Sequence, residues 1–539
     1  MAKLRQLNTD RDYVPMMVVA IASILSIAAF VHYFNEGVTM LYVDAQSHLL
    51  ISRRVIDNTT SGTSFGQLGG IWLPLTHVLS LPLVGIDELY HTGAAGSIVS
   101  MVAYVLTTLF LYKLVRELSN DRGAGFVAAV LFAFNPNILY MQSTAMTELA
   151  LYFCTIASVY YLYKVCQEPD RLLYSFLCGL FIALGCWVRY EAWIILGMEF
   201  LILIVVYFLA KFRGWKLTAH IFYFPVVAFA GVFGWMAWNT IIFGNPLEFQ
   251  TGEYAKPALW VAADDPVIGN PVMSFMTYHL ATLHNVGPLF YVAIFGALWY
   301  VIKNRFSAKS LAPLVLLAIY PAFIGMLYFG QRPLKVPELS NGDMYNIRFA
   351  LFMMLFVSVF AGYLARKYIL AKVLIVGFSA LVYAGMVQGG IIALEDPRLD
   401  QSTVLRVTQE QGSTWFRECY DGGQVLLESY GSEKFQFDSQ VNLGDFIYEG
   451  SYQLWEPAME EPWLYARWVV LRGPATVERA RRVAVFTDKT WERWRESSEF
   501  RQHYRLMYQN EGLEIWRLKS GPQLATASEY CSAPLIETR

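Results

Sequence analysis

Long apolar runs follow one another along the first three quarters of the chain, separated by polar connections. Each run is close to the roughly 20 residues that an α-helix needs to cross a bilayer. The runs therefore predict about eleven transmembrane helices. Their approximate positions are 16–31, 97–114, 123–140, 148–163, 172–188, 193–210, 221–242, 287–302, 311–329, 347–365 and 373–393. No small-residue cleavage site follows the first run, which favours a retained helix over a signal peptide.

The pattern changes near residue 394, where charged, aromatic and turn residues begin to mix. Residues 402–417 have helical spacing, 424–428 and 468–472 resemble buried strands, and 477–498 has the pattern of a charged amphipathic helix. Residues 504–508 and 513–517 flank Asn510-Glu511-Gly512, which is typical of a hairpin. We expect a transmembrane domain over residues 1–393 and a small α/β domain over residues 394–539. The second domain either shapes and stabilises the outer end of the first or binds an acceptor or glycan.

The composition agrees with a polytopic α-helical membrane protein. Hydrophobic residues make up 56% of the chain and charged residues 16%, which is too apolar for one soluble domain of this length. No basic block or recognition motif indicates a nucleic-acid partner. The six cysteines show no C-x-x-C or Cys/His ligand spacing, so zinc and thiol redox chemistry are not expected.

Lysine and arginine occupy the N-terminus and every second connection, whereas the opposite connections are longer and carry acids. The positive-inside rule then places the N-terminus in the cytoplasm. With an odd number of spans, the C-terminal domain is extracytoplasmic, and the protein is a multi-pass protein of the cytoplasmic membrane. Exported domains meet oxidising conditions, so we also expect a disulfide between Cys419 and Cys531, the two cysteines of that domain.

Charged residues recur where apolar runs begin or end on this outer side. They are Asp44 and His48 after the first run, Glu148 at the start of the fourth, Arg189 and Glu191 between the fifth and sixth, His279 and His284 late in the loop before the eighth, and Arg332, Lys335 and Arg348 around the start of the tenth. Two carboxylates with several cations suit a site that binds a phosphate and activates a hydroxyl. We selected Asp44 and Glu148 as candidate catalytic residues. The candidate substrate-binding residues are His48, Arg189, Glu191, His279, Lys335 and Arg348.

Each candidate also has a structural explanation. Asp44 could mark a helix end, and Glu148 could be an acid favoured in a first helical turn. Arg189 and Glu191 could pair only with each other, and Arg348 could extend to the membrane interface. His279 could be an ordinary interfacial histidine.

Several segments together resemble the GT-C class of polytopic glycosyltransferases, especially the protein O-mannosyltransferases and the aminoarabinose transferases that modify lipid A. The segments are Asp44-Ala45-Gln46-Ser47-His48, Trp72-Leu73-Pro74-Leu75, Ala128-Ala129-Val130-Leu131-Phe132-Ala133-Phe134-Asn135-Pro136, Glu148 and Asn346-Ile347-Arg348-Phe349. The likeness covers residues 14–365. It differs from the family pattern at Asp44, which has no neighbouring acid, and this puts metal binding through that motif in doubt.

The resemblance implies an inverting transfer of a sugar from a polyprenyl-phosphate donor to a glycan, lipid or protein acceptor outside the cytoplasmic membrane. In that reaction Asp44 is the expected general base and Glu148 supports it, while Arg348 and Arg189 bind the departing phosphate. No cofactor is required by the pattern, although a divalent metal ion held by Glu148 is an open alternative. The competing function is a transporter or flippase of lipid-linked sugars, but the internal repeats typical of transporters are not evident.

Overall fold

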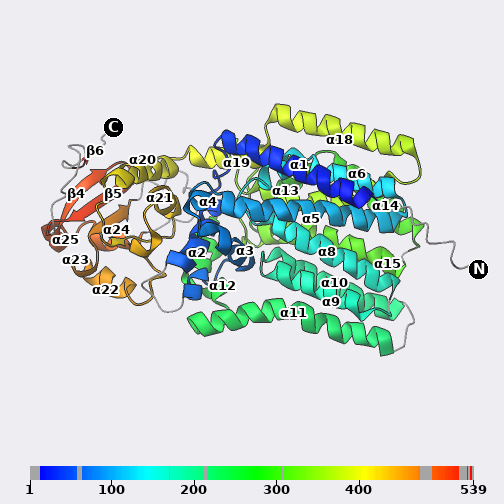
Figure 1. The fold of residues 1–539 in the computed structure, drawn as a ribbon, viewed down its shortest axis with the longest axis horizontal. Coiled ribbons are helices and arrows are strands. Elements are labelled where there is room, and N and C mark those ends of the chain that lie inside the picture. Colours follow the sequence, from blue (N-terminus) through cyan, green and yellow to red (C-terminus); the bar gives the residue numbers. More distant parts are fainter. Residues whose placement is uncertain are drawn as a thin grey trace, which may run out of the picture.

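The computed structural model describes residues 13–57, 64–168, 170–209, 215–305, 307–473, 488–520, 531 and 535–536. A bundle of long helices occupies one end of the molecule and a smaller domain with a sheet occupies the other (Figure 1). The division of the chain into two domains near residue 394 stays a prediction from the sequence. Short helices of the bundle's connections lie between them.

Most predicted apolar runs form helices of the bundle. These are α1 (Val14–Asn35), α5 (Ala94–Ser119), α6 (Arg122–Ala133), α8 (Glu148–Gln167), α9 (Leu172–Cys186), α10 (Glu191–Leu209), α11 (Trp215–Phe243), α13 (Pro271–Val286), α14 (Leu289–Lys303), α16 (Ile319–Tyr328), α17 (Met353–Leu364) and α18 (Ile369–Gly389). Within the described ranges, seven helices are long and apolar enough to cross a membrane, or eight if the bent pair α13 and α14 is one span. Four further apolar helices are shorter, so eleven crossings stay a prediction.

The shorter helices arise where capping residues interrupt an apolar run. The run at 123–140 divides after α6, because Asn135 has extended backbone and its side chain caps α7 (Pro136–Met141) by accepting a hydrogen bond from Ile138 N–H. Proline at the first position of α7 is pre-organised for a helix start. The run at 311–329 begins as a 3-10 helix, η4 (Ala312–Leu317), before α16.

The connections at one end of the bundle fold into short helices that face the smaller domain. They include α2 (Val43–Asp57), η1 (Ser64–Leu68), α3 (Leu75–Val84), α4 (Asp87–His91), α12 (Glu248–Thr251), η2 (Glu253–Ala255), η3 (Pro257–Leu259) and η5 (Ile347–Phe352). Arg54 near the end of α2 fastens the two parts together, because it donates hydrogen bonds of 2.6 Å to Ser429 and Gln436 of the C-terminal domain.

The C-terminal domain contains a six-stranded sheet of order β2-β1-β3-β5-β4-β6 within the described residues. Its strands are β1 (Val425–Leu426), β2 (Phe446–Ile447), β3 (Trp468–Arg472), β4 (Tyr504–Gln509), β5 (Leu513–Leu518) and β6 (Leu535–Ile536). Strand β1 pairs in parallel with β2 and β3, while β5 pairs antiparallel with β3 and β4. The buried strand at 468–472 and the hairpin of β4 and β5 are therefore confirmed.

In the described part of this domain, seven α-helices accompany the sheet. They are α19 (Ile392–Gln401), α20 (Val404–Cys419), α21 (Glu433–Asp438), α22 (Trp455–Glu460), α23 (Pro462–Tyr465), α24 (Lys489–Trp494) and α25 (Ser498–His503). The sequence predicted one helix over 477–498, but the described part of this range contains only the short helix α24 and the first residue of α25, so that prediction is wrong there. Residues 477–487 lie outside the described ranges, and Asp488 has extended backbone and caps α24 through Trp491 N–H.

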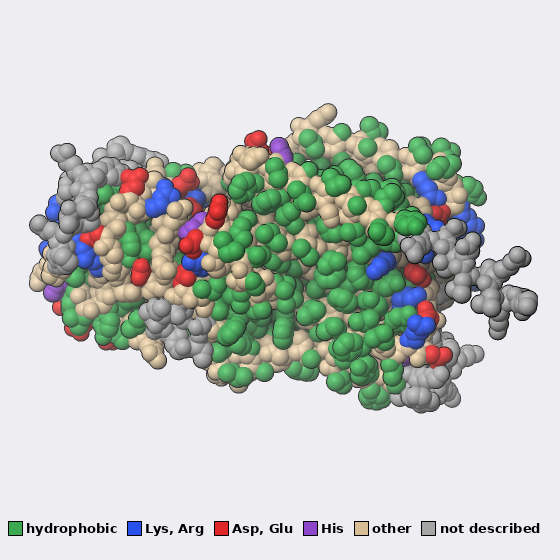
Figure 2. Space-filling view, in the orientation of Figure 1, with side chains coloured by type: hydrophobic (Ala, Val, Ile, Leu, Met, Phe, Trp, Pro, Cys, Tyr) green, Lys and Arg blue, Asp and Glu red, His purple; other side chains and the backbone are tan. Residues whose placement is uncertain are grey.

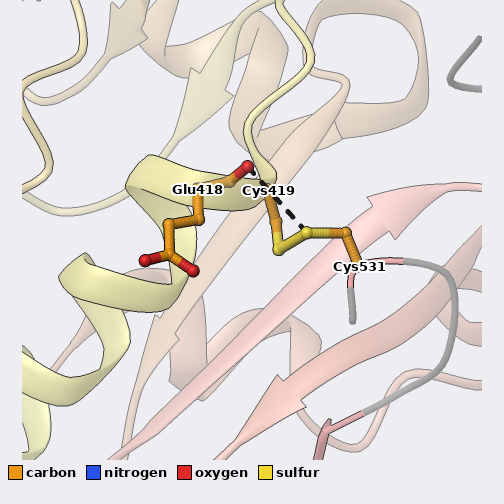
Figure 3. The surroundings of a disulfide bond; sticks show 3 residues. All are labelled: Glu418, Cys419 and Cys531. Carbon is orange, nitrogen blue, oxygen red and sulfur yellow. Dashed lines mark hydrogen bonds between the residues drawn. A yellow bond between two sulfur atoms is a disulfide. The ribbon is translucent and has the colours of Figure 1, made fainter. Parts of the chain in front are cut away.

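The predicted disulfide is confirmed. Cys419 at the end of α20 is bonded to Cys531, with a Cα–Cα distance of 5.4 Å (Figure 3). The two cysteines are 112 positions apart, so the bond closes a long loop of the chain that contains strands β1 to β5. The remaining cysteines are unpaired and belong to helices α8 and α9.

On the face shown in Figure 2, the surface of the bundle is largely apolar, and charged side chains gather over the C-terminal domain and at the opposite end of the bundle. Lysine and arginine are prominent at that opposite end. An apolar band between two charged ends suits a protein that crosses a bilayer. Which end faces the cytoplasm stays a prediction from the sequence.

Candidate functional site

A cavity of about 590 Å³ lies between the helical bundle and the C-terminal domain. Its size is within the roughly 300–1,000 Å³ of ordinary ligand pockets. The bundle and its connections contribute Asp44, Ser47, Trp72, Arg332 and Phe349 to the lining, among others. The C-terminal domain contributes the opposite wall, which includes Tyr430, Glu433, Tyr448, Glu449 and Tyr452.

Arg348 brings together the two acids that the sequence analysis selected. Its guanidinium donates a hydrogen bond to Asp44 Oδ2 and another, from Nε, of 3.2 Å to Glu148 Oε1. Asp44 belongs to the first turn of α2 and Glu148 to the first turn of α8. The expectation that Asp44 and Glu148 lie on one side of the bundle is thus matched by the geometry.

The backbone around Arg348 is held in place by polar contacts. Asn346 takes a left-handed conformation (φ 56°) at the start of η5, which asparagine tolerates better than most residues. Ile347 N–H then donates to Asp396 Oδ2 at 3.1 Å, and Asn285 donates to Ile347 O at 2.9 Å. These contacts connect η5 to α19 and to α13, and thereby position the Arg348 side chain.

Arg189 is the second guanidinium of this cluster. It donates to Glu148 Oε1 at 3.1 Å, to Thr147 Oγ1 at 3.0 Å and to Glu191 Oε1 at 2.9 Å. The structure therefore excludes the alternative in which Arg189 and Glu191 pair only with each other. Burial alone would lower the pKa of Arg189, but the carboxylates of Glu191 and Glu148 raise it above its usual value.

The two acids differ in their access to the cavity. The Asp44 side chain is 45% exposed and lines the cavity, whereas Glu148 is buried and does not. Glu148 Oε1 accepts from both Arg189 and Arg348, while its Oε2 has no hydrogen-bond partner in the described part of the chain. Asp44 can reach a ligand, and Glu148 holds the two arginines that surround it.

His48 lies one helical turn after Asp44, behind the cavity wall. Its Nδ1 is 2.8 Å from Nε2 of His77, and its ring centroid is 4.4 Å from that of Trp72. Burial, followed by the neighbouring His77 ring and the guanidinium groups of Arg189 and Arg348, holds the pKa of His48 well below its usual range. His48 is therefore neutral near pH 7, and it supports Trp72 instead of lining the cavity.

The structure places other selected residues outside the cavity. His279 and His284 lie on helix α13, so their expected position in a loop is wrong. The helix begins at Pro271, because the Asn270 side chain caps it by accepting a hydrogen bond from Met273 N–H. His279 is 2.8 Å from the hydroxyls of both Tyr320 and Tyr291.

Lys335 forms an ion pair of 2.8 Å with Asp343. Neither Lys335 nor His279 lines the cavity, so their predicted contact with a substrate has no geometric support.

Arg332 stands out among the lining residues. It has no hydrogen bond or ion pair to any other residue in the described ranges, although it lies within electrostatic range of Glu191, Arg189 and Asp44. Burial lowers its pKa from the usual value, because few opposite charges offset the loss of water. The sequence marked Arg332 only as a residue flanking the tenth run. Its position beside a proline, at the outer end of an apolar run, was the available signal.

The aromatic and acidic wall of the C-terminal domain was not found from the sequence. Tyr430, Glu433, Tyr448 and Tyr452 lie in irregular segments or at a helix start, where no periodic pattern distinguishes them. Among the described residues, no group of three or more His, Cys, Asp and Glu side chains is arranged to hold a metal ion. The charges of Asp44 and Glu148 face Arg348 and Arg189.

Comparison with known proteins gives one family match and related folds. The family of dolichyl-phosphate-mannose-protein mannosyltransferases matches residues 89–238. The crystal structure of ArnT from Cupriavidus metallidurans in the apo state is similar, with a TM-score of 0.56 at 13% sequence identity, over 93% of this chain and 99% of that one. An Archaeoglobus fulgidus oligosaccharyltransferase, crystallised with Zn and sulfate, gives a TM-score of 0.47 at 13% identity, over 84% and 68% of the two chains. A search of curated protein sequences found no match.

The family match and the likeness to ArnT confirm the resemblance drawn from the sequence. The chain has the polytopic helical fold of ArnT together with a small C-terminal sheet domain, along almost the whole length of both proteins. The family match runs from α4 to α11 and includes Glu148, Arg189 and Glu191.

Proposed function

We propose that this chain transfers a sugar from a polyprenyl-phosphate donor to an acceptor hydroxyl, with inversion, in the cavity between its two domains. The observation that carries the proposal is the unpaired Arg332 beside the accessible carboxylate of Asp44. An anion stabilises the charge of a guanidinium that has no partner in a partly buried cavity. A guanidinium also binds two phosphate oxygens at once, in a bidentate manner. The pair thus offers one group for a leaving phosphate and one for a proton.

The reaction requires a base, because a protonated sugar hydroxyl is a poor nucleophile. Asp44 takes the proton of the acceptor hydroxyl while that oxygen forms a bond to the anomeric carbon. The bond between the anomeric carbon and the phosphate oxygen breaks, and its electron pair stays on the phosphate. Arg332 stabilises this growing charge. Attack from the side opposite to the phosphate inverts the anomeric centre in one displacement.

The cluster of Arg348, Arg189 and Glu148 holds the Asp44 side chain in position. Arg348 and Arg189 were expected to bind the phosphate, but both donate to carboxylates and neither lines the cavity. We assign them to orienting Asp44 and neutralising the buried Glu148. A positioned general base contributes about 10² to 10⁴ in rate, and this positioning is what the cluster supplies.

A lipid-linked donor suits the place of the cavity. The lining combines Arg332 and Asp44 with apolar side chains such as Leu50, Ile51 and Phe243, at the end of the apolar bundle. A polyprenyl chain in the bilayer would therefore bring its phosphate to the level of Arg332. The charge pattern of the connections supports an extracytoplasmic position for this end.

The test uses the full-length protein with a panel of polyprenyl-phosphate sugars, and it measures donor binding and release of polyprenyl phosphate. Arg332→Ala should weaken donor binding by about ten- to a hundredfold, the usual loss for a hydrogen bond to a charged group. Arg398→Ala is a matched control, because Arg398 is exposed and pairs with Glu395 on the surface of α19.

Two outcomes would contradict the proposal. One is the absence of polyprenyl phosphate release with every donor. The other is an Arg332→Ala protein that binds donor as tightly as the control. Movement of an intact lipid-linked sugar across the membrane, without release, would instead favour the flippase.

A further inference from the structure

The outer wall of the cavity has a different chemical character from the inner wall. The C-terminal domain supplies three tyrosines, Tyr430, Tyr448 and Tyr452, and the connection after α11 adds Tyr254 and Trp260. Tyr254 and Tyr430 pack with ring centroids 5.0 Å apart, and the Tyr452 side chain is 47% exposed. Aromatic rings thus dominate this wall, whereas the inner wall carries Asp44 and Arg332.

Several acids also line the outer wall, but most of them already have partners. Glu449 accepts hydrogen bonds from Ser429 N–H and Tyr430 N–H at 2.7 and 2.8 Å. Glu253 pairs with Lys489 at 2.8 Å. Glu433 differs from these, because it has no hydrogen bond or ion pair to any other described residue. Its carboxylate is available to a ligand.

This combination of groups matches the surface of a carbohydrate. A sugar ring presents apolar C–H faces, which pack on aromatic rings, and hydroxyl groups, which donate to a carboxylate. Pockets of this kind fix a ligand through an apolar lining and a few polar groups. An acceptor that carries phosphate or carboxylate groups would instead meet the like charges of Glu433 and Glu449, and the cation that lines the same wall, Arg406, is already paired with Asp400 at 3.0 Å.

A peptide acceptor fits this wall less well. Extended peptides commonly bind by adding a strand to an exposed sheet edge. The edge strand that precedes the lining residues Tyr448 and Glu449, β2, consists of only Phe446–Ile447, so it offers little main chain for such pairing. Glu449, which follows β2, is engaged with backbone N–H groups of the same domain.

We propose that the outer wall is the acceptor subsite of the transferase suggested above, and that the acceptor is an uncharged carbohydrate held by Tyr452 and Glu433. This inference rests on the proposed function, since it names the acceptor class for the same cavity. The inner wall then receives the anionic donor and the outer wall the neutral acceptor. Arg332 on the inner wall then binds the phosphate of the donor, while Glu433 on the outer wall accepts hydrogen bonds from acceptor hydroxyls.

The test measures binding of defined probes to the full-length protein by saturation-transfer-difference NMR and titration. The probes are maltotetraose and chitotetraose, which are neutral, tetragalacturonate, which is anionic, and a Ser/Thr-rich decapeptide. We expect saturable binding of a neutral tetrasaccharide, at least about tenfold tighter than binding of tetragalacturonate. Glu433→Gln should narrow this difference, and Tyr452→Ala should weaken binding of the neutral probe by about tenfold.

Two further variants separate this inference from the proposed function. Arg332→Ala should weaken donor binding without changing tetrasaccharide binding. Glu456→Gln is the matched control for Glu433→Gln, because Glu456 is exposed and lies outside the cavity.

Binding of the decapeptide alone would overturn the inference, as would equal binding of tetragalacturonate or no binding of either neutral probe. Each of these results would leave the donor measurements on Arg332 unaffected. Conversely, tetrasaccharide binding with no polyprenyl-phosphate donor bound would reject the proposed transferase while identifying a carbohydrate-binding cavity.

Discussion

Asp44→Asn is the sharpest test of the chemistry, because it changes basicity and little else. Asparagine keeps the size of the side chain and its oxygen still accepts from Arg348. The Asp44 side chain is 45% exposed, so its substitution leaves no unpaired charge buried at position 44. Arg348 also keeps its hydrogen bond to Glu148. We therefore expect a folded protein that retains donor binding.

The expected loss is in turnover, by about 10² to 10⁴, the usual contribution of a positioned general base. The assay is a single-turnover measurement of polyprenyl phosphate release from bound donor, with donor affinity measured separately. Arg348→Ala would be a poorer test, since removing one partner of a buried ion pair costs about 3–5 kcal/mol and leaves Glu148 less neutralised.

Asp57→Asn provides the matched control. Asp57 belongs to the same helix, pairs with Arg53 at 2.8 Å and does not line the cavity. Its substitution removes an acid and an ion pair from α2 without touching the proposed site, so turnover should be retained. Near-normal turnover of Asp44→Asn, or an equal loss in Asp57→Asn, would refute the assignment of Asp44 as the base.

Two further predictions concern the C-terminal domain. Replacing both Cys419 and Cys531 by Ser should lower its free energy of unfolding by about 4–5 kcal/mol in the chain-entropy model, given the 112-residue separation. Denaturant unfolding followed by tryptophan fluorescence measures this, and an unchanged midpoint would contradict it. Burial, with Asp488 and Glu449 nearby, raises the pKa of Glu428 to about 7. The folded domain then holds that proton more tightly than the unfolded chain, so stability should fall as pH rises from about 4.5 to 7, by up to about 3 kcal/mol. Glu428→Gln should flatten this part of the profile, and parallel profiles would count against the effect.

Local features of the fold were accessible from the sequence because their causes are local. A bilayer requires long apolar helices, so the runs predicted α1, α5, α8 and α18 within a few residues. Strand β3 followed from a short apolar run, and the hairpin from turn residues between two such runs. The number of crossings does not follow from hydropathy alone, because capping residues such as Asn135 break apolar runs that hydropathy treats as continuous.

For the candidate site too, the sequence indicated individual residues but not their contacts. Asp44, Glu148, Arg189 and Arg348 could be selected because charge is costly at the end of a membrane helix and marks function there. Their pairing could not be foreseen, since Arg348 meets Asp44 across 304 positions and Glu148 across 200.

Only the tertiary structure decided that Arg332 has no partner in the described part of the chain, and which residues of the C-terminal domain line the cavity. Arg348 donates hydrogen bonds to two acids, Asp44 and Glu148, whereas Arg332 remains available to a ligand. Glu433 and Tyr452 enter the cavity only because the C-terminal domain packs against α2, where Arg54 binds Ser429 and Gln436. Sequence alone determined which residue types reach the outer end of the bundle. Packing between distant segments determined their partners, because the energy of a charge depends on what surrounds it.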